Sequence, residues 1–195
     1  MKSVRKPDDP VRLFKDQSAW VAWLREHHRN ASGIWLRLAK KGSGLQSVSY
    51  SEALESALCY GWIDGQKKPE NDKTWLQRFV PRSDKSIWSK INREKAEALI
   101  KNGRMTAAGR EAIARAKANG RWAAAYDSPS RSTVPGDFQA ALDANARANS
   151  FFQTLDRANR YAILFRIQTV KKAETRERKI KEFIAMLERK EKIHP

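Results

Sequence analysis

The residues best suited to hold a ligand lie between Gly61 and Asn92, where cationic, aromatic and amide side chains alternate with turn formers. We predict a ligand-binding set made of Trp62, Asp64, Arg78, Arg82, Trp88 and Asn92. An arginine binds a carboxylate or phosphate through two parallel N–H groups, and a tryptophan ring provides a wall for stacking. Arg82 also precedes an expected helix start, where backbone N–H groups and the helix dipole favour negative charge. The set predicts an anion-binding cleft in which Asp64 orients an arginine.

The same residue types allow two other interpretations. In a purely structural one, Asp64 forms an ion pair with Arg78 across a hairpin, and the tryptophans belong to the core. Such a buried pair is costly to desolvate. In an enzymatic one, a buried Asp64 acts as a general base. Whether the chain is an enzyme stays open at this stage.

Motifs for most common chemistries are missing from the sequence. It contains no Gly-x-Ser-x-Gly elbow, no phosphate-binding Gly-x-x-x-x-Gly-Lys loop and no dinucleotide fingerprint. One cysteine and three histidines are too few and too scattered for a structural zinc site. Cys59 lies in an apolar helical stretch, which predicts an inert, buried thiol. We therefore expect no metal, no cofactor and no internal disulfide.

The charge of the chain indicates the kind of partner. Its 195 residues include 39 Lys and Arg against 22 Asp and Glu, a net charge of +17. Residues 71–122 alone contain 13 basic and five acidic residues, a net charge of +8. A local positive field attracts anions, so we expect an anionic small molecule or a polyanion as partner. Nucleic acid is the alternative, although no recognition motif supports it.

The elements that must position these residues predict an α+β fold. The pattern divides the chain into an α+β module over 1–126, a linker over 127–136 rich in turn formers, and a helical module over 137–195. A helix capped by Asp16, a strand over 34–38 and a helix that begins with a Ser49 capping box come first. Strands over 62–64 and 74–80 then form a hairpin, and helices follow Ser86 or Ser89 and Thr106. We expect a small antiparallel sheet, the hairpin plus one or more strands, packed with helices in a predominantly helical protein.

The pattern of the C-terminal module predicts helices with apolar stripes. One helix starts at Pro135 and carries Phe138, Leu142 and later Phe151, Phe152 and Leu155. A second stripe contains Tyr161, Leu164 and Phe165, and a third helix follows Lys171 and Lys172. The third stripe has helical spacing and is expected to pack on the core.

The sequence also indicates the cellular compartment of the protein. No apolar run approaches the roughly 20 residues of a membrane helix, and no apolar segment follows the basic N-terminus. We therefore expect a cytoplasmic protein without a transmembrane segment. The sequence does not predict the oligomeric state.

Several segments resemble the bacterial YdeI/OmpD-associated, or bacteriocin-protection, family. They lie at residues 50–65 (Tyr-Ser-Glu-Ala-Leu to Gly-Trp-Ile-Asp-Gly), 78–82, 86–92, 103–109 and 171–176 (Lys-Lys-Ala-Glu-Thr-Arg). In the last of these, Ala173 replaces the proline that the family usually has. The resemblance covers most of residues 14–190.

The resemblance implies a role in resistance to bacteriocins or antimicrobial peptides, without an agreed reaction, cofactor or catalytic residue. Together with the residue pattern, it favours a non-enzymatic, cytoplasmic protein that binds anions or protects against stress or antimicrobial peptides. The alternative is a basic, nucleic-acid-associated protein.

Overall fold

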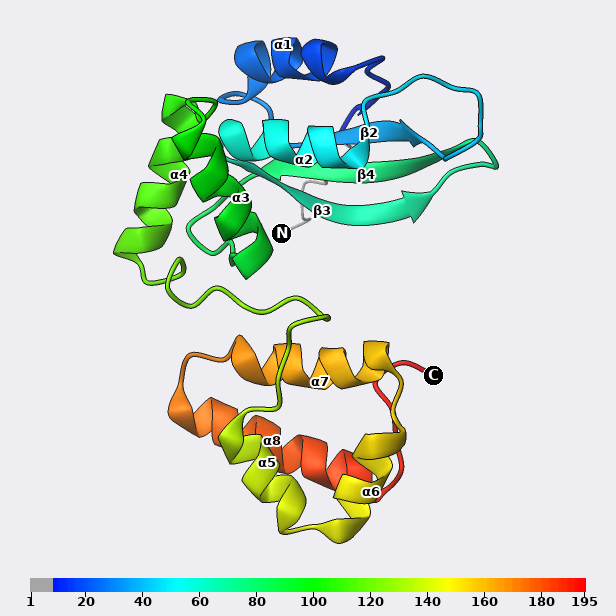
Figure 1. Ribbon diagram of the computed structural model, residues 1–195, viewed down its shortest axis with the longest axis vertical. Coiled ribbons are helices and arrows are strands. Elements are labelled where there is room, and N and C mark those ends of the chain that lie inside the picture. Colours follow the sequence, from blue (N-terminus) through cyan, green and yellow to red (C-terminus); the bar gives the residue numbers. More distant parts are fainter. Residues whose placement is uncertain (1–8) are drawn as a thin grey trace, which may run out of the picture. The chain divides into compact units, whose positions relative to one another are not determined.

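The computed structural model describes residues 9–195, and the chain forms two compact units (Figure 1). The first contains the chain up to Ile87 together with Asn92–Ala123. The second contains Trp88–Ile91 together with Ala124–Pro195. The second unit is therefore built from two separate stretches of the sequence.

The first unit contains a four-stranded sheet with helices packed against it. Its strands are β1 (Val11–Arg12), β2 (Ile34–Ala39), β3 (Trp62–Pro69) and β4 (Thr74–Pro81), in the order β1-β2-β4-β3. Its helices are α1 (Gln17–His27), α2 (Tyr50–Cys59), α4 (Ala107–Ala118) and all but the first two residues of α3 (Lys90–Lys101). In Figure 1, α1 and α2 lie over one face of the sheet. The α+β prediction is confirmed. The sheet is mixed, because β1, which the sequence pattern did not reveal, runs parallel to β2.

Local capping explains where these helices begin. The side chain of Asp16 accepts a hydrogen bond from the backbone N–H of Ala19 at the start of α1. Ser49 and Glu52 form the predicted capping box of α2. Thr106 caps α4. Each cap satisfies backbone donors that a helix start leaves without an intrahelical partner.

The hairpin of β3 and β4 is longer than the sequence pattern indicated. β3 continues to Pro69, and four residues connect it to β4. The pairing register shifts between Asp64 and Lys67, where the side-chain amide of Gln77 donates to the carbonyls of Gly65 and Gln66. The irregular part of the strand is thus held by a side chain of its neighbour, a contact that periodicity alone does not reveal.

The core of the first unit is aromatic. Trp20, Trp62 and Phe79 have at most 1% of their surface exposed, and the ring of Trp20 contacts both of the others. The indole N–H of Trp20 donates to the carbonyl of Ala53, 3.1 Å away in α2. This pairing satisfies a buried polar atom and ties α1 to α2.

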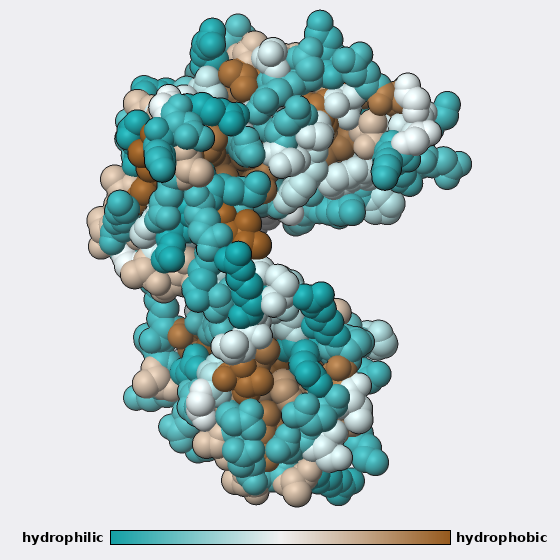
Figure 2. All heavy atoms as spheres, viewed as in Figure 1, coloured by the Kyte–Doolittle hydropathy of each residue, from teal (hydrophilic) through white to brown (hydrophobic). Residues whose placement is uncertain are grey.

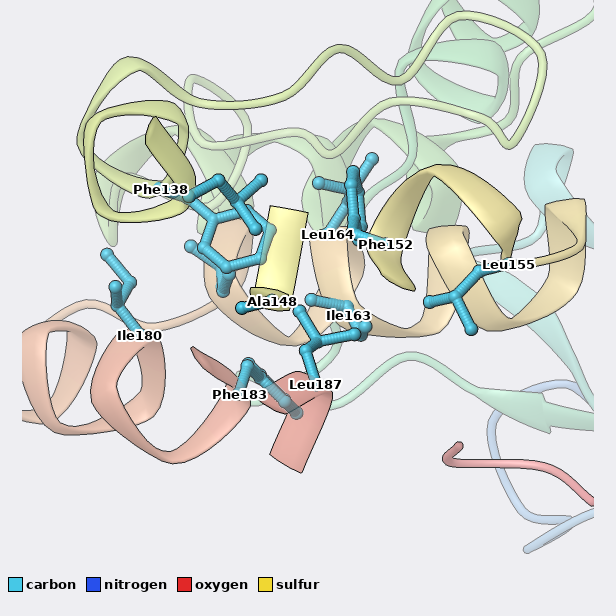
Figure 3. Close-up of a cluster of buried hydrophobic side chains, with 11 residues drawn as sticks. Phe138, Ala148, Phe152, Leu155, Ile163, Leu164, Ile180, Phe183 and Leu187 are labelled. Carbon is cyan, nitrogen blue, oxygen red and sulfur yellow. The ribbon is translucent and has the colours of Figure 1, made fainter. Parts of the chain in front are cut away.

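The second unit is helical, with α5 (Gly136–Asp143), α6 (Ala146–Thr154), α7 (Arg157–Gln168) and α8 (Ala173–Glu188). Its core contains 11 buried residues, and Figure 3 shows side chains of these helices converging on it. The single helix expected after Pro135 is in fact two helices. They are separate because Asn145 interrupts the stripe and caps α6 by accepting the N–H of Ala148.

An arginine joins three helices of this unit. The guanidinium of Arg176 in α8 donates to both carboxylate oxygens of Asp137 in α5, at 2.6 and 2.9 Å. It also donates to the carbonyl of Ile167, near the end of α7, at 2.7 Å. Arg176 closes the predicted Lys171–Arg176 motif, and its contacts give that motif a structural role.

The surface shown in Figure 2 is mainly hydrophilic, with hydrophobic residues in small separate groups. Within residues 9–195, none of the helices has the length and apolar character needed to cross a bilayer.

Candidate functional site

The six residues predicted to bind a ligand do not all fall in one unit. Trp88 belongs to the second unit. The others belong to the first: Trp62, Asp64, Arg78, Arg82 and Asn92.

Trp62 is part of the core. Only 1% of its surface is exposed, its indole N–H donates to the carbonyl of His28 at 3.0 Å, and its ring meets Trp20 and Trp23 edge-on. Its position is that of a packing residue between α1 and the sheet.

Asp64 and Arg78 have different partners. Asp64 accepts a hydrogen bond from the hydroxyl of Tyr50 at 2.8 Å. Arg78 forms an ion pair with Asp9, with Nη2 and Nε at 2.6 and 2.7 Å from the same carboxylate oxygen. The register pairs Asp64 with Phe79, so Asp64 and Arg78 project from opposite faces of the sheet. The expected Asp64–Arg78 ion pair is therefore wrong, and the role of Asp64 in orienting an arginine stays a prediction.

Arg82 and Trp88 are buried. Arg82 has 6% of its surface exposed, and its guanidinium donates to the carbonyl of Ile87 at 3.1 Å. Trp88 is 2% exposed, and its backbone carbonyl accepts the N–H of Tyr126. Asn92 lies in the first turn of α3 and is half-buried. These contacts hold the chain after β4. The side chains of Arg82 and Trp88 expose little surface to a ligand from solvent.

A pocket that sequence reasoning missed lies in the second unit. It has a volume of about 350 Å³ and is lined by Pro129, Ser132, Leu155, Arg157, Arg160, Tyr161 and Leu164. This volume lies at the low end of the usual range for small-molecule sites. Leu155 and Leu164 belong to the core cluster drawn in Figure 3, and because they also line this pocket, the core forms part of its wall. We call this space the arginine pocket.

The two arginines differ in how firmly they are held. Arg160 is half-buried, donates from Nη2 to the carbonyl of Gln153 at 2.8 Å, and stacks its guanidinium 5.3 Å from the ring centre of Phe152. Arg157 is exposed. Among the described residues, neither arginine forms an ion pair. Their positive charges are therefore not neutralised within residues 9–195.

Two polar atoms of the arginine pocket residues lack hydrogen-bond partners among the described residues. They are Nε of Arg160 and Oγ of Ser132, both buried. A buried polar group without a partner costs about 1–3 kcal/mol, so such groups usually meet a water molecule or a ligand. Both atoms carry an N–H or O–H group, the kind of donor that an anion accepts.

A second, more apolar pocket adjoins the first along α7. It has a volume of about 590 Å³ and is lined by Pro129, Arg157, Ala158, Tyr161, Ala162, Phe165, Arg166 and His194. Pro129, Arg157 and Tyr161 line both pockets. We call this space the apolar pocket.

The start of α7 positions both pockets. Asp156 caps the helix by accepting the N–H of Asn159, and this bond lowers the pKa of the Asp156 carboxyl. The buried side chain of Asn159 also bonds the backbone of His194 in both directions, at 2.8 and 3.1 Å. These bonds hold the segment after α8 beside α7 and thereby place His194 at the apolar pocket.

Tyr161 lies between the two pockets. Its hydroxyl donates to the carbonyl of Asp127 at 3.0 Å, and burial, followed by the neighbouring Tyr126 and Asp127, raises the pKa of Tyr161 to about 12. Lys90 forms an ion pair with Asp127 at 2.7 Å. Tyr161 is thus a neutral hydrogen-bonding wall at ordinary pH.

One sequence signal could have indicated this region. Arg157 and Arg160 are three residues apart, a spacing that places both on one side of a helix. The segment 123–168 carries a net charge of only +1, so the charge distribution did not draw attention to it. Ser132 and Pro129 lie in the stretch expected to be a linker.

Residues 9–195 contain no group of three or more His, Cys, Asp or Glu side chains that could hold a metal ion. The free thiol of Cys59 is buried, and burial raises its pKa, as expected for an inert cysteine.

Comparison with known proteins identifies two families. Residues 12–112 match the family described as Domain of unknown function (DUF8412), and residues 131–190 match the family described as Bacteriocin-protection, YdeI or OmpD-Associated. No curated protein and no solved structure matches the chain.

The segments that resemble the YdeI/OmpD-associated family are distributed over both matches. Residues 171–176 lie in the second match, whereas those at 50–65, 78–82, 86–92 and 103–109 lie in the first. The YdeI/OmpD-associated resemblance is thus confirmed over residues 131–190. Since the first match spans more than half of the chain, the protein belongs to the DUF8412 family and carries a C-terminal YdeI/OmpD-associated segment.

Proposed function

We propose that this protein is a binding protein for a small anion, and that the arginine pocket of the second unit holds the negative group. The observation that carries the proposal is the joint presence of Arg157 and Arg160 in one pocket, with no ion pair to either among residues 9–195, beside a buried serine hydroxyl. Among the described residues that line either pocket, none is acidic. The local charge therefore favours an anion.

The contacts of Arg160 support a site that is formed before the ligand arrives. Its hydrogen bond to Gln153 and its stacking on Phe152 restrict the guanidinium, so little conformational entropy remains to be lost on binding. The exposed Arg157 can then approach the anion from solvent. One restrained arginine and one exposed arginine are suited to reversible binding of an anion.

The five predicted residues of the first unit remain a second location for the same activity. Arg78 is the member best placed for it, since 34% of its side chain is exposed. Its ion pair with Asp9 would have to open, which makes the arginine pocket the better site. The description of the C-terminal family links that family to bacteriocin protection, and anion binding is the molecular activity that we propose would serve such a role here.

The test is calorimetric titration of the protein with inorganic phosphate, sulfate and pyrophosphate. We expect Arg157→Ala to weaken binding about 10- to 100-fold, the usual value of one charge-assisted hydrogen bond. Arg160→Lys keeps the charge but loses the planar guanidinium, and it should weaken binding as well.

The matched control is Arg147→Ala in α6, an exposed arginine outside both pockets. Affinity that falls equally in the control and in Arg157→Ala would show that only the overall charge matters. A steep salt dependence with DNA and RNA that neither variant changes would instead favour the nucleic-acid alternative. Loss of binding in Arg78→Ala alone would assign the site to the first unit.

A further inference from the structure

The arginine pocket continues into the apolar pocket along one side of α7. Ala158, Tyr161, Ala162 and Phe165 follow one another at helical spacing, and all four line the apolar pocket. The opposite side of α7 carries Ile163 and Ile167, which are fully buried in the core. The apolar pocket is therefore a separate feature of the helix and not an extension of its core face.

Side-chain size and packing create the space. Ala158 and Ala162 are small and lie one turn apart, and along the helix they alternate with the larger Tyr161 and Phe165. The ring of Phe165 is held edge-on by Tyr126, with 4.9 Å between ring centres, and it also contacts Tyr161. A wall of fixed aromatic rings beside two alanines is suited to an alkyl or aryl group.

Charge surrounds this apolar wall. Arg157 lies where the two pockets meet, while Arg166 and His194 complete the lining of the apolar pocket. A wholly apolar occupant would leave the charges of Arg157 and Arg166 without a counter-ion among the described residues, and a small inorganic anion would leave the apolar wall exposed. An occupant with one anionic end and one apolar end satisfies both parts.

The donors of the arginine pocket favour a phosphate group as the anionic end. Arg157, Arg160 and Ser132 together offer more N–H and O–H groups than the two oxygens of a carboxylate can use well, whereas a phosphate monoester presents three terminal oxygens.

We propose that the natural ligand is a free phosphate monoester with an apolar substituent, its phosphate in the arginine pocket and its apolar part against Ala158, Ala162 and Phe165. The inference rests on the proposed function and adds the class of ligand. It concerns a single soluble molecule, because the two pockets together have the size of a small-molecule site.

Three probes separate the parts of the proposal: inorganic phosphate, decyl phosphate below its micelle concentration, and octyl glucoside, which has a tail but no charge. Each methylene group removed from water strengthens binding about fourfold. Burial of three or more should therefore make decyl phosphate at least about 50-fold tighter than inorganic phosphate. Octyl glucoside should bind far more weakly than decyl phosphate.

A filling variant tests the location. Ala158 is exposed on α7, so Ala158→Trp should fold and occupy the apolar pocket. We expect this variant to bind decyl phosphate about as weakly as inorganic phosphate, while its affinity for inorganic phosphate stays unchanged. Ala140→Trp, at an exposed position in α5 outside both pockets, is the matched control and should behave as the wild type.

The outcomes distinguish this proposal from the one on which it rests. If inorganic phosphate binds through Arg157 but decyl phosphate binds no tighter, the ligand class is wrong and the anion site stands. If octyl glucoside binds as well as decyl phosphate, the charged end has no role and the amphiphilic anion is refuted. If neither phosphate binds, both proposals fail.

Discussion

Replacing Gly109 by alanine tests whether the close approach of α2 and α4 supports the first unit. A Cβ atom on Gly109 would overlap the sulfur of Met105 and the carbonyl oxygen of Cys59, and it would lie 2.9 Å from the carbonyl carbon of Cys59. The methionine side chain can move, but the backbone carbonyl cannot move without separating the two helices. The same carbonyl accepts a 2.6 Å hydrogen bond from the hydroxyl of Thr106.

The expected magnitude follows from three contributions. Overpacking of this kind costs about 3 kcal/mol, at the upper end of its usual range, because the obstacle is backbone. Loss of the Thr106–Cys59 hydrogen bond adds about 1 kcal/mol. Alanine is about 1 kcal/mol better than glycine in a helix, which offsets part of the cost. The free energy of unfolding should therefore fall by about 3 kcal/mol in Gly109→Ala.

Urea unfolding followed by tryptophan fluorescence is the appropriate assay, because six of the seven tryptophans lie in the first unit. Gly65→Ala is the matched control. It makes the same substitution in the same unit, and its Cβ would meet no atom closer than 3.8 Å. The control should change the free energy of unfolding by less than about 1 kcal/mol. A Gly109→Ala protein as stable as this control would refute the close-packing argument.

Two further predictions concern pH. Hydrogen bonds from Arg176 hold the pKa of Asp137 below its ordinary value. This carboxylate therefore contributes fully to stability above the unfolded-state pKa of about 3.9. The contribution is lost as pH falls through the lower folded-state pKa. At neutral pH the wild type should have a free energy of unfolding about 1 kcal/mol higher than Asp137→Asn, the value for a partly exposed pair. In urea titrations this difference should vanish between about pH 5 and pH 2. A difference that stays constant with pH would contradict this assignment. The pKa of Tyr161 is raised to about 12, so the folded state retains a proton that the unfolded state loses, and stability should fall as pH rises from about 10 to 12. Tyr161→Phe should lack the phenolate absorbance step near pH 12 and this added alkaline sensitivity, and an unchanged step would assign it to another tyrosine.

Features governed by neighbouring residues could be predicted from the sequence. The caps formed by Asp16, Ser49 and Thr106 depend on side chains and backbone groups three positions apart, so the printed sequence contains both partners. The alternation of Ile34, Leu36 and Leu38 likewise identifies a strand with one buried face.

Features that depend on distant residues could not be predicted in the same way. The partner of Arg78 is Asp9, 69 positions away, and nothing in the local pattern distinguishes it from Asp64. Both pockets on α7 depend on which side of that helix faces the core and on Pro129, which reaches the helix from the expected linker. Arginine and tryptophan content indicated anion binding, but it could not locate the site.

The discontinuity of the second unit has a consequence for synthesis on the ribosome. Trp88–Ile91 emerge before the residues from Ala124 onward with which they share a compact unit, and the first of their partners is Tyr126. Trp88 is 2% exposed in the finished protein, but the unit to which it belongs is incomplete until the second stretch has been made. The backbone N–H of Lys90 at the start of α3 also awaits the carbonyl of Tyr126. The second unit can therefore be completed only after the translation of its second stretch, Ala124–Pro195, and this interval is the one in which binding by a chaperone would be most valuable.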